Sequence, residues 1–324
     1  MRFPWVRAPS PPPWVEPSYW AFNLTFSVLF LIYMAVLYLG LQRRWVLSKY
    51  TVSAVVPIAL GNILMGTALM PTCETPTVPA LEYPFMTLLA VVSFALLCAS
   101  EVATYLFNLI GPPAAFTFLR LPVLAVHLST LLFYVFSAYD PACLGRDTFG
   151  RPLHPLRYVM WTTSVSCSVI SVFFVAEDLT RKSRHQTRWN STALHRECIL
   201  AIMAVVLMFV TGYLATLRFA TGLWANVVNY GASTVFMYLA LGKLTHMLHL
   251  CATNPLVVQQ QGGGIQFRLI TYAIVVTWHA FPAVWVLGAS NIVTPEIEHC
   301  GYVICDLLAK YVLLYVYSAT VSNA

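Results

Sequence analysis

An aspartate and a lysine lie four residues apart in an apolar segment near the C-terminus, Cys305-Asp306-Leu307-Leu308-Ala309-Lys310. This spacing places both side chains on one helix face, one turn apart. Ionisable residues inside a membrane helix are costly and mark functional sites by default. A lysine in an apolar pocket is readily neutral, which is what the nucleophile of a Schiff base needs. The alternative is a buried ion pair that only joins two helices, and the pair alone favours neither interpretation.

The preceding apolar segment carries an aromatic stripe. Trp278, Phe281 and Trp285 lie at positions i, i+3 and i+7, so they share a helix face, and Pro282 is expected to kink the helix there. Aromatic stripes are usually core packing. A kinked aromatic face directly before a buried Asp-x-x-x-Lys is far less common, and it predicts a cofactor pocket.

The elements that position these residues are predicted to be membrane-spanning helices. The 324 residues are 59% hydrophobic and 9% charged, whereas soluble domains have about 25% charged residues. Such a chain could not cover a water-exposed surface, so its solvent must be the lipid bilayer. The net charge of +6 comes from basic residues clustered in loops, which indicates membrane topology and not a nucleic-acid partner.

Nine apolar spans are long enough to cross a bilayer, at about 20 residues each. They cover roughly 20–41, 50–71, 83–109, 114–138, 157–178, 195–217, 224–250, 268–289 and 299–321. The loops after the first and fifth spans are basic, which predicts that they are cytoplasmic. The N-terminus is then outside and the C-terminus cytoplasmic. The alternative for the first two spans is a re-entrant or interfacial hairpin.

With these motifs, the chain resembles the microbial (type I) rhodopsins, such as bacteriorhodopsin and the channelrhodopsins, over about residues 81–321. The resemblance implies an all-α integral membrane protein with a seven-helix retinal-binding bundle in residues 81–324. Two additional transmembrane helices would precede it in residues 1–80. It also implies that Lys310 carries all-trans retinal covalently, as a Schiff base, and that Asp306 is a counterion.

Further pocket residues are implied by position in the family's helices. Arg157 in Arg157-Tyr158-x-x-Trp161 would organise charge outside the chromophore, and Trp161 would sandwich the polyene with Trp278 and Trp285. The remaining residues expected at the chromophore are Phe281, Pro282, Met208, Gly212, Tyr230, Ser233, Met237, Met160 and Ser164. The cysteines and histidines show no metal-ligand spacing, so no metal site is expected.

Two departures from the family pattern argue against a proton pump. Met160 stands where pumps carry the carboxylate that accepts the proton, and Ser171 stands where they carry the donor. A protonated Schiff base and Arg157 then give two positive charges against Asp306. Three outcomes are open: a deprotonated Schiff base that absorbs in the ultraviolet, a bound chloride beside Met160 and Ser164, or another carboxylate. Glu101 is the candidate carboxylate, although a lipid-interface or cytoplasmic-end position is preferred for it.

Without pumping, a light-gated channel or a sensor remains, and a nine-span transporter would require the motifs to be accidental. The span 114–138 has no acidic residue, so a pathway lined by Arg120, His127 and Arg157 would favour anions over cations. Glu298 is also expected to lie along the ion pathway. Alternatively, His127 is a hydrogen-bonded packing residue and Arg120 extends to the membrane interface.

The extra N-terminal spans resemble those of enzyme-linked rhodopsins. No soluble catalytic domain follows the last span, so this chain is not expected to be an enzyme itself. It would instead signal through its cytoplasmic loops to a partner, or through a C-terminal enzyme domain of a longer protein. A homo-oligomer also remains open.

Overall fold

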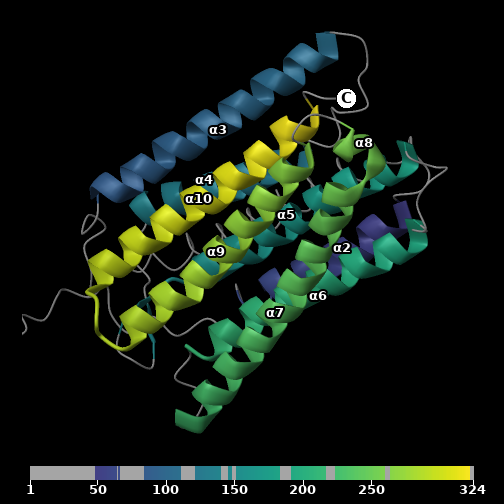
Figure 1. The fold of residues 1–324 in the computed structure, drawn as a ribbon. Helices are drawn as coiled ribbons and strands as arrows, with labels where there is room; N and C mark the ends of the chain where they lie inside the picture. The colour runs from purple at the N-terminus through teal and green to yellow at the C-terminus, as the bar shows by residue number, and fades with distance from the viewer. Residues whose placement is uncertain are drawn as a thin grey trace, which may run out of the picture.

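The computed structural model describes residues 48–63, 65, 84–110, 121–139, 145–147, 151–182, 191–216, 223–259 and 263–321. They form a bundle of long helices (Figure 1). The helices are α2 (Ser48–Ile63), α3 (Pro84–Ile110), α4 (Leu121–Tyr139), α5 (Pro155–Lys182), α6 (Ser191–Leu214), α7 (Leu223–Thr253), α9 (Gly263–Ala289) and α10 (Pro295–Val321). The short helix α8 (Pro255–Val258) follows α7, and the strands β1 (Gly145–Arg146) and β2 (Pro152–Leu153) form an antiparallel hairpin before α5.

Five of the long helices are long and apolar enough to cross a membrane. In the described residues, five stretches have both the length and the apolar composition of a membrane span: 85–104, 155–177, 193–214, 226–253 and 264–289. A shorter apolar stretch, 122–135, lies in α4. The chain is therefore a multi-pass membrane protein, as predicted. The last seven expected spans coincide with α3, α4, α5, α6, α7, α9 and α10, with ends that differ by up to five residues where both ends are described.

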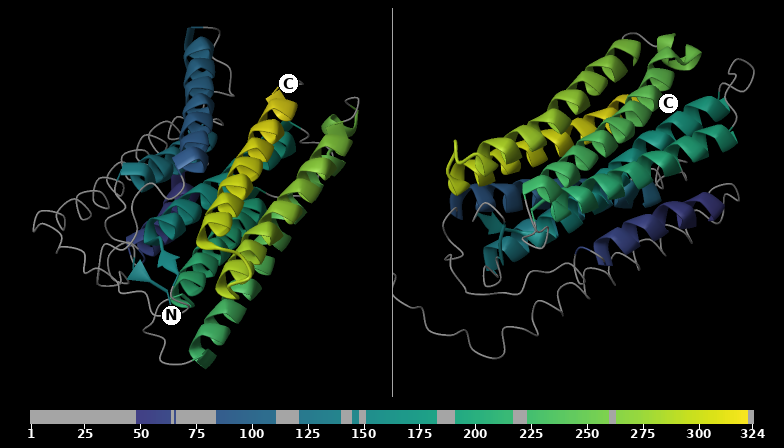
Figure 2. Two further views of the ribbon diagram at one scale, coloured as in Figure 1. Left: turned by 90° about the vertical axis from the view of Figure 1, so that its left-hand side faces the viewer. Right: turned by 90° about the horizontal axis from the view of Figure 1, so that it is seen from below.

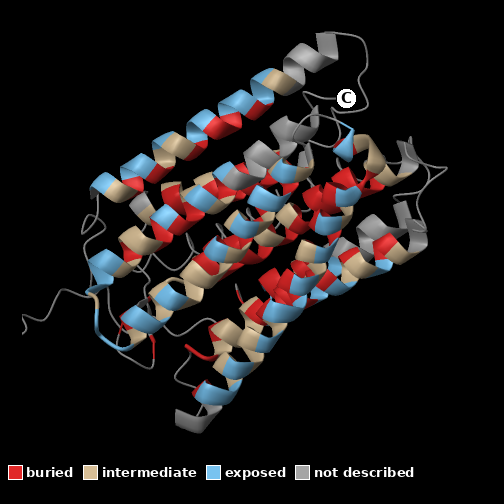
Figure 3. Cartoon of the chain, in the orientation of Figure 1, coloured by how far each residue is buried: buried red, intermediate tan, exposed pale blue. Residues whose placement is uncertain are grey.

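From α3 onward, long helices that follow one another in the chain pack side by side, and α10 closes the bundle against α3 and α4. The helix α5 lies inside this arrangement, and 89% of its membrane-spanning window is buried. Buried positions face inward along each helix, whereas the outer faces of α3 and α9 are exposed (Figure 3). These outer faces carry large apolar side chains, including Phe85, Leu96, Tyr272 and Val276, as expected for contact with lipid.

One helix that precedes the seven is described. The helix α2 packs against α6 and α5, and its ribbon lies along the side of the bundle (Figure 2). Asn62 Nδ2 donates a hydrogen bond to Thr163 Oγ1 at 2.8 Å. A Cβ atom at Gly61 would lie 2.7 Å from Val206 Cγ1, so glycine permits this close approach. The expected first span, 20–41, lies outside the described residues.

Candidate retinal site

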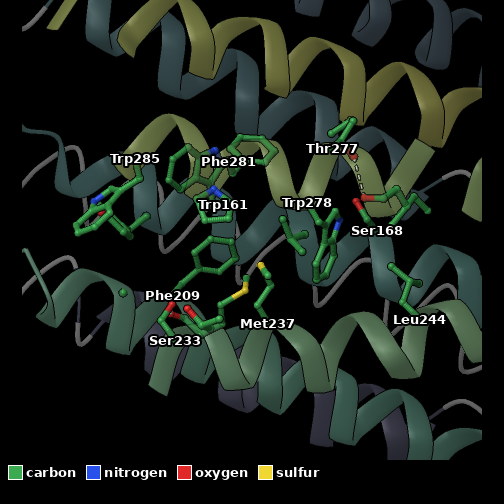
Figure 4. Close-up of a pocket in the computed structure, with 18 of the residues that line it drawn as sticks. Trp161, Ser168, Phe209, Ser233, Met237, Leu244, Thr277, Trp278, Phe281 and Trp285 are labelled. Atoms are coloured by element: carbon green, nitrogen blue, oxygen red, sulfur yellow. Dashed lines mark hydrogen bonds between the residues drawn. The ribbon is translucent and has the colours of Figure 1, made fainter. Parts of the chain in front are cut away.

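A largely apolar cavity, open on one side, lies between α5, α6, α7, α9 and α10 (Figure 4). Its wall contains most of the predicted pocket residues: Trp161, Met208, Gly212, Tyr230, Ser233, Met237, Trp278, Phe281, Pro282, Trp285 and Lys310. The sequence analysis did not single out Ser168, Phe209, Leu244, Thr277 and Tyr302, which also line it. The three predicted tryptophans therefore share one cavity, although they come from two helices.

The amine of Lys310 is buried at this wall, with 3% of the residue exposed. Its Nζ donates a hydrogen bond to Asp306 Oδ1 at 2.5 Å, across one turn of α10. The ring of Phe281 lies 5.9 Å from Nζ and covers the amine from α9. Lys310 is thus an enclosed amine beside an apolar cavity, with a carboxylate to balance its charge.

Asp306 is fully buried and accepts hydrogen bonds from two further helices. Tyr134 Oη on α4 donates to Oδ2 at 2.8 Å, and Trp161 Nε1 on α5 donates to Oδ1 at 3.1 Å. Tyr134 also stacks on Phe94 of α3, with ring centroids 5.9 Å apart. The sequence analysis missed Tyr134. The sequence did contain an indication of its role: Tyr134 lies in an apolar span, and a buried tyrosine hydroxyl needs a hydrogen-bond partner.

Aromatic contacts fix the wall of the cavity. Tyr230 stacks on Trp285 at 4.7 Å, and Phe281 meets Trp161 edge to face at 5.2 Å. Ser233 Oγ donates to the main-chain oxygen of Met208 at 2.8 Å, which joins α7 to α6. Figure 4 shows side chains from facing helices projecting into one space.

Met160 and Ser164 do not line the cavity, contrary to their expected place at the chromophore. Met160 is fully buried, and the hydroxyls of Thr130 and Ser164 each approach its Sδ at 3.7 Å. Successive helix residues are 100° apart, so the residue before Trp161 faces α4 while Trp161 faces the cavity. A chloride between Met160 and Ser164 would have to displace this contact.

Arg157 lies one helical turn before Trp161 and is 7% exposed. Its Nη2 lies 3.0 Å from Nδ1 of His299, and its guanidinium covers the ring of Tyr302 at 4.6 Å. Arginine only donates hydrogen bonds, so Nδ1 must accept. The hydrogen of a neutral His299 is then on Nε2, which lies 3.2 Å from Thr87 Oγ1. This chain of contacts joins α5, α10 and α3.

A second charged cluster lies at the same end of the bundle. Arg151 pairs with Asp147 at 2.7 Å and with Glu298 at 2.8 Å. Burial acts to lower the pKa of Arg151, but the two carboxylates outweigh it and raise the pKa above its ordinary value. Glu298, expected on an ion pathway, is therefore held in an ion pair. Arg151 and Asp147 were not singled out from the sequence.

The expected excess of positive charge does not arise in this part of the molecule. Three carboxylates, Asp147, Asp306 and Glu298, stand against three cationic side chains, Arg151, Arg157 and Lys310, which gives three negative and three positive charges. The sequence analysis counted only Asp306 because Asp147 precedes the predicted span and Glu298 was assigned to an ion pathway.

The remaining predicted residues have different outcomes. His127 is fully buried on α4; neither ring nitrogen has a hydrogen-bond partner of normal geometry, although the imidazole lies near the main chain of Lys310. Glu101 is 3% exposed on α3, so it does not lie at the lipid interface, and a position toward the cytoplasmic end of the helix stays a prediction. Arg120 lies outside the described residues.

Comparison with known proteins agrees with this geometry. The family model described as bacteriorhodopsin-like protein matches residues 83–322. The chain belongs to this family of microbial rhodopsins, whose members bind retinal covalently through a lysine. No curated protein gives a significant sequence match.

Solved structures share the fold at low identity. The transmembrane domain of the Salpingoeca rosetta rhodopsin phosphodiesterase is 14% identical, with a TM-score of 0.61, and covers 84% of this chain and 96% of its own. The red light-activated channelrhodopsin Chrimson is 15% identical, with a TM-score of 0.54, and the match covers 78% of this chain and 86% of Chrimson's. A light-driven proton pump from Leptosphaeria maculans is 16% identical, with a TM-score of 0.57, and the match covers 74% of this chain and 95% of the pump's.

Proposed function

We propose that this protein is a light-activated photoreceptor that carries all-trans retinal on Lys310 and does not pump protons. The observation that supports it is the enclosed Lys310 amine, which opens onto an aromatic cavity and pairs with Asp306 at 2.5 Å. The residues fit the cofactor, because an apolar cavity suits a polyene and a buried amine with a counterion suits a protonated Schiff base. Bound retinal supplies light absorption and isomerisation.

Each side chain then has a defined task. Lys310 Nζ holds the proton, and Asp306 balances its charge. Tyr134 and Trp161 hold the Asp306 carboxylate in place by hydrogen bonds, so it is preorganised before light arrives. The aromatic wall formed by Trp278, Phe281 and Trp285 excludes water from the amine.

The absence of proton pumping rests on two buried side chains that do not titrate. Met160 is packed between two hydroxyls, and Ser171 Oγ donates to the Cys167 main-chain oxygen at 2.9 Å. Neither can accept or donate a proton in the way a carboxylate does. Steady illumination should therefore not acidify the medium of cells that express this chain, and a sustained acidification sensitive to an uncoupler would contradict this.

For the output, we propose a light-gated channel that prefers anions. The described helix α4 has no Asp or Glu over residues 121–139, and it contributes His127 to the interior. Arg157 is buried, and within the described part of the chain its hydrogen-bond partner is His299 and no carboxylate contacts it directly. A cationic group without a direct carboxylate favours anions in a pathway. In the proposed orientation, with the N-terminus outside and the C-terminus cytoplasmic, Arg157 lies on the outer side.

A sensory module is the second candidate for the output. Its support is the helix α2, which packs against α5 and α6 outside the seven-helix bundle, and the likeness to a rhodopsin phosphodiesterase membrane domain over 84% of the chain. Such a module would act on a partner or on an enzyme domain through the proposed cytoplasmic loops.

Retinal attachment is tested by adding all-trans retinal to the purified chain. A visible or near-ultraviolet pigment band should form, and hydroxylamine should bleach it. Lys310→Ala should abolish the band. Lys243→Ala is the matched control, because Lys243 pairs with Glu197 away from the cavity and its removal should leave the band intact. A band that persists in Lys310→Ala would refute the assignment.

Whole-cell recording under illumination separates the two outputs. A channel should give a light-dependent current whose reversal potential follows the chloride gradient. A reversal potential that follows sodium or protons would reject the anion preference. A pigment that forms normally but passes no current would favour the sensory module.

A further inference from the structure

The buried imidazole of His127 lacks a hydrogen bond of normal geometry. The residue is 0% exposed, and neither Nδ1 nor Nε2 has a hydrogen-bond partner of normal geometry. Leaving a buried polar group without a partner costs about 1–3 kcal/mol. A leucine at this position would avoid the cost in the middle of an apolar helix. The side chain therefore needs a reason that the packing does not provide.

The register of α4 against α10 places His127 beside Lys310. Tyr134 marks the level of Asp306, to which it donates a hydrogen bond. His127 lies seven residues earlier, on nearly the same face of α4 and about 10 Å along the axis. Lys310 lies about 6 Å beyond Asp306 in the same direction along α10. In agreement with this register, the imidazole approaches the main chain of Lys310.

Lys310 is thus bracketed by two ionisable side chains. On one side, Asp306 already accepts from Lys310, Tyr134 and Trp161, so most of its acceptor positions are occupied. On the other side, a neutral His127 has one ring nitrogen with a free lone pair, whichever tautomer is present. Asp306 is built to remain a counterion, whereas His127 has capacity for a proton.

We propose that His127 accepts the proton of Lys310 Nζ after illumination and later returns it. This inference rests on the proposed attachment of retinal to Lys310. The N–H bond at Nζ breaks and its electron pair stays on Nζ, while a new N–H bond forms at the free ring nitrogen of His127. The positive charge moves with the proton, so no oxidant or reductant is involved. A neutral imidazole suits this transfer near neutral pH, directly or through one water.

The charged and titratable groups around His127 are compatible with this transfer. On α10 they are Asp306, Lys310 and Cys305. On α5, Arg157 lies toward the Tyr134 end, and the Ser168 hydroxyl is bonded to its own helix at Ser164. On α3, Cys98 and Glu101 are buried. Glu101 follows Phe94 by seven residues just as His127 precedes Tyr134 by seven, and Phe94 stacks on Tyr134.

This register puts the carboxyl group of Glu101 at the depth of His127 on the neighbouring helix. An ionised Glu101 would stabilise the imidazolium that forms. Lys182 marks one end of α5. Among the described residues between Lys310 and that end of the bundle, His127 is the first proton acceptor that Lys310 meets. Met160 lies on the other side of Lys310 and has no group that accepts a proton.

The test uses the whole chain with all-trans retinal and histidine labelled with nitrogen-15. Loss of the Nζ proton is followed by near-ultraviolet absorbance after a flash, and histidine protonation by light-minus-dark infrared difference spectra. The label-sensitive imidazolium band should rise with the same time constant as the near-ultraviolet absorbance. Near-ultraviolet absorbance without an imidazolium band, or no near-ultraviolet absorbance, would overturn the proposal.

Two variants assign the band among the eight histidines of the chain. His127→Phe and His127→Asn should remove the imidazolium band and slow the loss of the Nζ proton at least tenfold. His279→Phe is the matched control: His279 bonds to Tyr238 on the outer face, and both signals should remain. If both His127 variants lose the proton at the wild-type rate, His127 is not the acceptor. Failure of the wild-type chain to form any pigment would instead refute the proposed function.

Discussion

Gly288 and Glu298 lie so close together that no side chain fits between them. A Cβ atom at Gly288 would be 2.2 Å from Glu298 Oε2 and 2.7 Å from Arg151 Nη1. The absence of a side chain on α9 therefore permits the ion pair between α10 and the loop before α5. This is a steric requirement, since Gly288 lies inside a regular helix and not in a turn.

We expect Gly288→Ala to push the Glu298 carboxylate away from Arg151 and to lower the free energy of unfolding by about 1–3 kcal/mol, through overpacking and a weakened, partly buried ion pair. Denaturant titration in mixed micelles measures the change. Gly242→Ala is the matched control, because a Cβ there meets nothing within 4 Å. It should be neutral or stabilising by up to about 1 kcal/mol. Equal effects of the two substitutions would contradict the steric argument.

Tyr134→Phe should weaken the site without preventing pigment formation. The substitution removes the 2.8 Å hydrogen bond to Asp306 Oδ2 and leaves the ring stacked on Phe94. A hydrogen bond to a charged group contributes about 1.5–3 kcal/mol, so the pigment should lose that amount of stability. Thermal bleaching of the pigment measures it. Tyr311→Phe, at an exposed position on α10, is the control and should bleach like the wild type.

The sequence was sufficient for the bundle and for one side of the site. The span from 157 to 178 and the pair Asp306 and Lys310 could be predicted because uninterrupted apolar length and a costly intramembrane ion pair are properties of local sequence. The cavity wall on α9 followed from the spacing of Trp278, Phe281 and Trp285. None of these inferences required knowledge of which helices touch.

The parts that sequence reasoning missed depend on contacts between helices. Tyr134 becomes a ligand of Asp306 only because α4 packs beside α10, and Arg151 pairs with Glu298 across a loop and a helix. Met160 was assigned to the chromophore by its position in a motif, but the rotation of α5 turns it toward Thr130. Helix rotation and register are tertiary properties that a single sequence does not specify.

The balance of three carboxylates and three cationic side chains favours the third of the open outcomes, in which further carboxylates supply the missing negative charge. The Lys310 Schiff base should be protonated near neutral pH, so the pigment should absorb in the visible and not partly in the ultraviolet. Adding chloride at fixed pH should not shift the band. A visible spectrum that appears only with chloride would show that a halide completes the site. Absorption spectra across pH, in chloride and in a bulky anion such as gluconate, make the measurement.

Met160→Asp tests the same balance from the other direction. The new carboxylate would meet the hydroxyls of Thr130 and Ser164, which now face Met160 Sδ. An added negative charge near Lys310 favours the protonated Schiff base, so the visible band should persist to higher pH than in the wild type. The isosteric and uncharged Met160→Leu is the control. If the visible band of Met160→Asp is lost at the same alkaline pH as in the wild type, position 160 is too far from Lys310 to affect its protonation.

The contact between Arg157 and His299 should show energetic coupling in a double-mutant cycle. His299→Leu removes the acceptor at 3.0 Å and leaves a buried guanidinium with no hydrogen-bond acceptor among its described contacts, so it should destabilise the protein by about 2–3 kcal/mol. Arg157→Met removes the other partner and leaves Nδ1 of His299 buried.

The double variant should lose less than the sum of the two single variants, by about 1–2 kcal/mol, because each single change leaves its partner unsatisfied and the double change leaves neither. Denaturant titration of the four proteins in mixed micelles gives the coupling energy. His249→Leu, at an exposed position on α7, controls for the loss of a histidine and should change stability by less than about 0.5 kcal/mol. If the two substitutions add within about 0.5 kcal/mol, His299 does not hold Arg157. The guanidinium would then be held by the rings of Phe133, Trp161 and Tyr302 that surround it.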